Sequence, residues 1–136
     1  MNYLLDTCVI SEFTSKQPEP QVIEWMDTVN DETLYLSAIT IGEIQRGIAK
    51  LPDSPRREKL EKWLHEDLFL RFNGRILPLT AQVMLTWGKL TAQGRTLPAG
   101  DSMIAALALH HDLCLVTRNI KDFDGTGVTL FNPWPS

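Results

Sequence analysis

Short apolar segments alternate with longer amphipathic ones along this chain, and this alternation limits the fold more than any other feature of the sequence. Apolar runs of strand length occur at residues 2–5, 33–37, 75–77, 113–117 and 128–131. Strands that alternate with helices form mostly parallel sheets, because each helix carries the chain back to the start of the next strand. We therefore predict a single α/β domain over residues 1–136, with four to five strands and helices on both faces of the sheet.

Helix start signals occupy the intervening segments. Ser54 is a capping residue, and Pro55 after it suits the first helical position. The sequence predicts helices after Cys8 and at residues 20–29, 41–50, 55–70, 80–92 and 101–111.

Three acidic residues fall where this fold would bring them to one edge of the sheet. Asp6 directly follows the first strand, and Glu43 lies in the first turn of the helix that the second strand enters. Asp122 follows the strand at 113–117 by five residues. In a parallel sheet the carboxyl ends of the strands share one edge, and ligands bind there.

Asp101 reaches the same edge through helix geometry. It opens the helix at 101–111, which leads directly into the strand at 113–117 and must run antiparallel to it. At about 1.5 Å per residue the helix spans roughly 16 Å, and five strand residues at about 3.3 Å each span a similar length. The start of the helix therefore returns to the carboxyl end of the strand.

Each acid also fits a purely structural role at a helix start. Asp6 suits a helix cap, Asp101 suits a first turn, and residues 40–43 and 119–122 have capping-box spacing. Caps, however, do not require four acids to converge. Two carboxylates about 5 Å apart repel by roughly 3 kcal/mol at an effective dielectric near 20, so four in one pocket favour a bound cation. Carboxylates suit Mg²⁺ or Mn²⁺, which activate water for in-line displacement at phosphorus.

Four motifs, in this order along the chain, resemble those of the PIN domain family. They are Leu4-Leu5-Asp6-Thr7, Ser37-Ala38-Ile39-Thr40 before Glu43, Gly100-Asp101 before Ile104-Ala105-Ala106, and Leu115-Val116-Thr117-Arg118-Asn119 before Asp122-Phe123. The ending, from Gly127-Val128 to Asn132-Pro133-Trp134, is similar to the VapC and FitB-like branch, the toxins of type II toxin–antitoxin pairs. The resemblance covers essentially the whole chain.

The resemblance implies a metal-dependent nuclease that leaves a 5′-phosphate and a 3′-hydroxyl. The family's metal-binding acids fall on Asp6, Glu43, Asp101 and Asp122, and its polar site residues fall on Thr7, Thr117 and Asn119. Many relatives have Asn or Ser two residues after the first acid, where this chain has Cys8. A hydrogen bond from that position is therefore an open question.

The net charge of −4 is unevenly distributed along the chain. Residues 1–67 carry 13 acids and 7 bases, whereas residues 68–136 carry 4 acids and 6 bases. Two of those four acids are proposed metal ligands, so the rest of the second half is basic enough to bind a phosphate backbone. Arg118 and Lys121 lie beside the site and are the candidate substrate-binding residues. The alternative is that both are solvated loop residues.

An apolar stripe at helical spacing consists of Leu60, Trp63, Leu64 and Leu68. Such stripes usually belong to the core. In a domain this small, the apolar face of a helix can also be larger than the area that the sheet covers. Members of the resembled family use this region for dimerisation and for binding the antitoxin. A core and a partner groove are therefore both open interpretations.

These features together predict a Mg²⁺-dependent endoribonuclease toxin that cuts single-stranded or loop RNA and is inhibited by a VapB-like antitoxin. Asp6 and Asp101 would hold the main metal ion, which the other two acids complete, while Asn119 and Thr117 orient ligands or the scissile phosphate. We also expect a homodimer and contact with operator DNA only through the antitoxin complex. The sequence has no signal peptide and no apolar run long enough to span a bilayer, so a cytoplasmic protein is expected.

Three other functions would place acids on a similar sheet. A haloacid-dehalogenase-type phosphatase needs Asp-x-Asp after the first strand, where Cys8 takes the second place. A signalling receiver domain needs a phosphoacceptor Asp at the end of the third strand, where Pro78 stands. A DNA-binding regulatory subunit of a toxin–antitoxin-type complex would keep the fold with little cleavage, and this alternative stays open.

Overall fold

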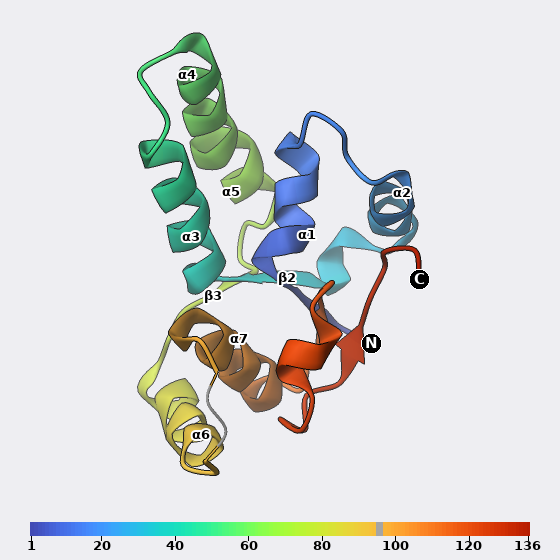
Figure 1. Ribbon diagram of the computed structural model, residues 1–136, viewed down its shortest axis with the longest axis vertical. Coiled ribbons are helices and arrows are strands. Elements are labelled where there is room, and N and C mark those ends of the chain that lie inside the picture. Colours follow the sequence, from blue (N-terminus) through green and yellow to red (C-terminus); the bar gives the residue numbers. More distant parts are fainter. Residues whose placement is uncertain (95–96) are drawn as a thin grey trace.

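One parallel sheet with the strand order β3-β2-β1-β4-β5 forms the centre of the computed structural model, which describes residues 1–94 and 97–136 (Figure 1). The strands are β1 (Tyr3–Leu5), β2 (Leu34–Ser37), β3 (Ile76–Leu77), β4 (Cys114–Val116) and β5 (Leu130–Phe131). Every strand pairing is parallel, as predicted. Each strand is shorter than its apolar run by one or two residues, because the run extends past the residues that pair with a neighbouring strand.

Helices cover both faces of the sheet, as predicted. Figure 1 shows α1 (Thr7–Ser11), α2 (Pro20–Thr28), α3 (Ala38–Ala49), α4 (Pro55–Lys62) and α5 (Phe69–Arg71) on one side, and α6 (Ala81–Thr91) and α7 (Ala99–His110) on the other. Short 3₁₀ segments are η1 (Glu12–Thr14), η2 (Asp31–Thr33) and η4 (Ile120–Phe123), and the π-helical segment η3 (Trp63–Leu68) joins α4 to α5. In residues 1–94 and 97–136, no helix is both long and apolar enough to cross a membrane.

The strands send alternate side chains into two hydrophobic cores. In β1, Leu5 packs with the helices α1 to α3, while its neighbour Leu4 packs with α6 and α7. In β4, Val116 and Leu115 divide in the same way. All four side chains are fully buried. This alternation is the two-residue period of a strand with an apolar core on each face, and it fixes the register of the central strands.

The predicted starts of the helices beside Asp6 and Asp101 are wrong. The first helix begins at Thr7 rather than after Cys8, because Asp6 Oδ1 accepts a hydrogen bond from the Thr7 amide at 2.9 Å. The helix that carries Asp101 begins at Ala99, which still leaves Asp101 in the first turn.

The helix α3 begins at Ala38 rather than at residue 41. Ser37 Oγ accepts the Thr40 amide at 3.0 Å, so Ser37 is the cap and Thr40 lies inside the helix. The predicted capping box at residues 40–43 is therefore wrong, and Glu43 lies in the second turn. A cap at the last residue of β2 lets the chain pass from strand to helix without a loop.

The apolar stripe through α4 and η3 divides between the two interpretations given above. Leu64 and Leu68 are buried in the core beneath α1 to α3. Leu60 and Trp63 are half-buried; they pack against that core and also line a hollow on the surface. The stripe is thus core along one edge and exposed groove along the other.

Leu64→Ala should lower the free energy of unfolding by about 2–5 kcal/mol, because it opens a cavity in a packed core. Urea denaturation measures this change. The matched control is Leu70→Ala, six residues further along the same helical segment, whose side chain is 78% exposed. That control should change stability by less than about 0.5 kcal/mol. Equal changes in the free energy of unfolding for the two substitutions would contradict the placement of Leu64 in the core.

Candidate active site

Asp6 is held at the carboxyl end of β1 by groups from two neighbouring segments. Its Oδ1 accepts the Thr7 amide, and its Oδ2 accepts the hydroxyl of Thr117, which follows β4, at 2.8 Å. The backbone N–H of Asn119 donates in turn to Thr117 Oγ1 at 3.0 Å. Asp6 is 6% exposed, so these donors stabilise a largely buried carboxylate. Asp6 is consequently both a helix cap and a fixed member of the site.

Cys8, two residues after Asp6, contacts both Asp6 and Thr117. Its Sγ lies 3.8 Å from Asp6 Oδ2 and 3.9 Å from Thr117 Oγ1. Burial, together with the negative charge of Asp6, raises the pKa of the Cys8 thiol to about 11. The thiol is therefore protonated at neutral pH and points a weak donor at Asp6.

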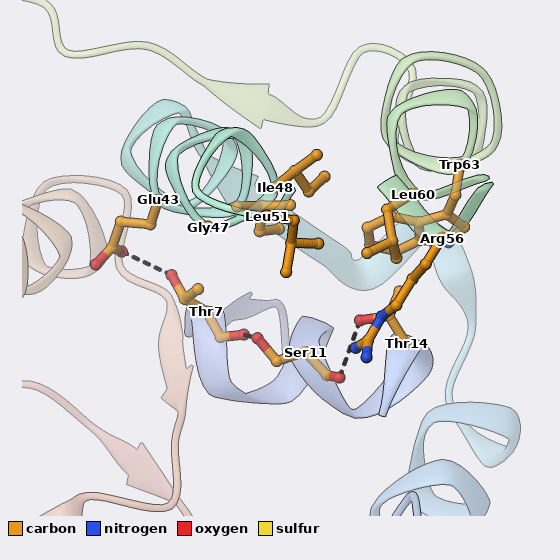
Figure 2. Close-up of a pocket in the computed structure, with 11 residues that line it drawn as sticks. Thr7, Ser11, Thr14, Glu43, Gly47, Ile48, Leu51, Arg56, Leu60 and Trp63 are labelled. Carbon is orange, nitrogen blue, oxygen red and sulfur yellow. Dashed lines mark hydrogen bonds between the residues drawn. The ribbon is translucent and has the colours of Figure 1, made fainter. Parts of the chain in front are cut away.

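Glu43 is connected to the sheet by a chain of hydroxyl groups. Thr7 Oγ1 donates to Glu43 Oε1 at 2.7 Å, and it lies 2.9 Å from Thr40 Oγ1 (Figure 2 shows the Thr7–Glu43 bond). Ser37 Oγ donates to Thr40 Oγ1 at 3.2 Å. Ser37 and Thr40 are fully buried, whereas Glu43 is exposed.

The carboxylate sets the direction of every bond in this chain. Each hydroxyl has one proton to donate, and an ionised carboxylate can only accept. Since Thr7 donates to Glu43, Thr40 must donate to Thr7, and Ser37 to Thr40. Thr7 therefore donates one hydrogen bond to Glu43. Both buried hydroxyls, of Ser37 and Thr40, have a hydrogen-bond partner in this chain.

Asp101 lies where the predicted return of the helix α7 would place it. An ideal Cβ on Gly100 would be 3.6 Å from Glu43 Oε2, so the first turn of α7 packs directly beside Glu43. Burial raises the pKa of the Asp101 carboxyl, and the negative charges of Asp6, Asp122 and Glu43 raise it further. The other three predicted acids thus lie close enough to Asp101 for their charges to act on it.

The last motif contributes exposed groups around η4. The Asn119 carbonyl accepts the Asp122 amide at 3.0 Å, but the Asn119 side chain makes no capping bond, so the predicted capping box at residues 119–122 is wrong. Arg118 and Lys121 are both exposed at the edge of the site. The Arg118 guanidinium lies 5.8 Å from the centre of the Trp134 ring, a cation–π distance that keeps it beside the last strand.

The donor set fits a hard divalent cation. It consists of carboxylates with neutral hydroxyls behind them, and the charged groups that act on Asp101 are all carboxylates. In the part of the chain that the structure describes, no three Asp, Glu, His or Cys side chains lie close enough to hold one metal ion as they stand. A cation at this edge would therefore have to draw the carboxylates together.

The sequence predicted Thr40 as a helix cap and gave Ser37 no role, although both residues support the site through the hydroxyl chain. Their signal was available in part, because a Ser at a strand end beside a predicted helix is a strong capping candidate. The contact between Thr40 and Thr7 was not available, since it joins residues 33 positions apart.

Thr40→Val should lower the free energy of unfolding by about 1–3 kcal/mol, because it leaves the proton of the buried Ser37 hydroxyl without an acceptor and removes the donor to Thr7. Urea denaturation tests this, with Thr40→Ser expected to recover most of the loss. Thr129→Val is the matched control at an exposed position and should stay within about 0.5 kcal/mol of the wild type. A wild-type midpoint for Thr40→Val would show that the hydroxyl chain contributes nothing.

Asp101→Asn should raise the melting temperature in EDTA at neutral pH, because it removes a carboxylate that its neighbours repel. The pKa of Asp101 is raised above its ordinary value of 3.8, so the wild type escapes the penalty below that pH. The penalty develops as the pH rises through the raised pKa. The advantage of Asp101→Asn should therefore be larger near about pH 7 than near about pH 3.5.

A lower melting temperature for Asp101→Asn than for the wild type would instead show that Asp101 only stabilises the helix dipole. Losing a favourable first-turn carboxylate would cost a few tenths to about 1 kcal/mol, so the variant would melt below the wild type. Asp53→Asn, an exposed acid outside the site, controls for the loss of one negative charge.

Comparison with known proteins agrees with this geometry. The PIN domain family matches residues 3–127. The toxin FitB of Neisseria gonorrhoeae is 37% identical over 135 residues, covering 96% of this chain and 97% of FitB. The VapC ribonuclease Y4jK of Sinorhizobium fredii is 36% identical over 135 residues, covering 96% of each chain.

Solved structures give the same result. A structure of FitAB bound to an IR36 DNA fragment aligns with a TM-score of 0.92 and 35% identity, covering 98% of this chain and 96% of that one. The order of the strands, the convergent acids and these matches have one explanation: the chain belongs to the PIN domain family, in its VapC/FitB-like branch.

Proposed function

We propose that this chain is the toxin of a type II toxin–antitoxin pair, a Mg²⁺-dependent endoribonuclease that hydrolyses phosphodiester bonds in RNA. The observation that carries the proposal is the convergence of Asp6, Glu43 and Asp122 on Asp101, at the carboxyl edge of a parallel sheet. The likeness to a VapC ribonuclease and to the toxin FitB supports a nuclease of this kind.

The residues of the site divide into rigid and adjustable members. Asp6 is buried and fixed by Thr117, so we propose it as the primary metal ligand together with Asp101. Glu43 and Asp122 are exposed, and both can move toward an ion to complete its coordination directly or through water. Mg²⁺, or Mn²⁺ in its place, would polarise the phosphoryl oxygen and activate water for in-line attack.

Polar groups at the rim suit a phosphate. We propose that the exposed Asn119 side chain orients the scissile phosphate. Arg118 and Lys121 lie on the same loop and are proposed to contact flanking phosphates. Thr117 acts through Asp6, because its hydroxyl proton is directed at that carboxylate and is not available to substrate.

The proposed partners follow from the relatives. FitB is called a toxin, and FitAB has been solved bound to a DNA fragment. For this chain we propose an inhibitory VapB-like antitoxin, contact with operator DNA only through the complex with it, and a homodimer of the toxin. A regulatory subunit with little nuclease activity would share these partners, so only an activity measurement separates the two functions.

Asp6→Asn and Asp101→Asn should lose most Mg²⁺-dependent cleavage of RNA, since each removes a proposed ligand. The measurement is cleavage in vitro, together with sequencing of 5′-phosphate ends after brief induction in cells. Asp53→Asn should cleave as the wild type does. With a dissociation constant near ~1 mM, ~10 mM Mg²⁺ should also stabilise the wild type by about 1.4 kcal/mol and stabilise Asp101→Asn less. Full cleavage by folded Asp101→Asn would remove the metal-site mechanism, and no cleavage by the wild type would favour the regulatory subunit.

A further inference from the structure

A groove leads from the acid site to a basic surface beside α4, and we propose that it guides single-stranded RNA, with bases on its apolar floor and phosphates along its basic rim. The inference rests on the proposed function and adds the path that the single-stranded substrate follows to the acid site.

The groove consists of two connected hollows. The first, of about 250 Å³, lies between α1, α3 and α4, and Figure 2 shows Thr7 and Glu43 at one end and Arg56 and Trp63 at the other. The second, of about 620 Å³, lies between η1 and α4. The two hollows share the lining residues Thr14, Arg56, Leu60 and Trp63. A chain lying in the second hollow can therefore continue directly to Glu43.

The outer hollow concentrates positive charge. Four cationic residues line it, against one acid, Asp67: Lys16, Arg56, Lys59 and Lys62. These are four of only seven bases in residues 1–67, a half of the chain with 13 acids. Among the described residues, no carboxylate lies within ion-pair distance of Lys16, Arg56 or Lys59. Unpaired, exposed cations in a row attract a polyanion and lose little on binding it.

The floor of the groove is apolar and partly aromatic. It is formed by Phe13, Ile44, Ile48, Leu51, Leu60 and Trp63. In a single strand the faces of the bases are free to pack on such side chains, whereas in a duplex they are stacked inside. Together the floor and the rim match a single strand better than a duplex. A protein segment would use the floor but would leave the unpaired cations without counter-charges unless it were acidic.

The test measures binding of a fluorescent, unstructured RNA of about 12 nucleotides to the full chain in EDTA, so that no cleavage occurs. The groove variant is Arg56→Ala with Lys59→Ala. The matched control is Arg46→Ala with Lys89→Ala, which removes the same charges from exposed helical positions outside the groove lining.

Two lost phosphate contacts should flatten the slope of log K against log salt by about 1.4, roughly 0.7 per contact on a single strand. At about 0.1 M salt this corresponds to an approximately 25-fold rise in the dissociation constant. The control should retain most of the wild-type slope. A second variant, Lys16→Ala with Lys62→Ala, should reproduce the loss, and melting temperatures should show that all three proteins are folded.

Equal slopes for the groove variant and the control would overturn the proposal and leave the groove to a protein partner. An equal loss for single-stranded and duplex RNA would also overturn it, because the apolar floor would then play no part. Failure of the proposed function is a separate result. It would appear as no Mg²⁺-dependent cleavage by the wild type, whatever the groove variant does in EDTA.

Discussion

The parallel pairing of β1 with both β2 and β4 is the constraint on which the rest of this structure depends. The strand has hydrogen-bonded neighbours on each side and an apolar core on each face, so its register admits no slip. The carboxyl ends of these three strands consequently lie side by side. Asp6, the Ser37 cap and Thr117 occupy those ends, and the backbone amides of Thr7, Thr40 and Asn119 are hydrogen-bonded to their side chains.

The site combines a rigid interior with an exposed rim. Hydrogen bonds from Thr117 and from the Thr7 amide satisfy Asp6, the one acid of the site that is nearly fully buried. Glu43 is exposed, and the donor chain from Ser37 holds only its Oε1. A carboxylate held as Asp6 is would need little reorganisation to bind the proposed ion. The exposed acids would then adapt to that ion and to the substrate.

The negative charges near Asp101 destabilise the folded protein when no cation is bound. Burial and three neighbouring carboxylates all raise the pKa of Asp101, so the ionised protein at neutral pH is under electrostatic strain at this edge. The strain is the counterpart of the proposed metal affinity, because a bound cation would relieve the interactions that destabilise the free protein. Stability and function are therefore opposed at this site, as they commonly are in active sites.

The sequence alone determined the strands, the parallel sheet and the four acids, because these follow from local apolar runs and from the geometry of a helix that returns to a strand end. It also left two questions that local patterns do not resolve. Tertiary structure decided that Ser37 rather than Thr40 caps α3, and that Thr40 instead donates to Thr7. It also divided the α4 stripe, placing Leu64 in the core and Trp63 on a groove. The Ser37 cap is a local contact, but the Thr40–Thr7 bond and the division of the stripe depend on contacts between segments far apart in the chain. Such contacts exist only once the sheet has brought the segments together.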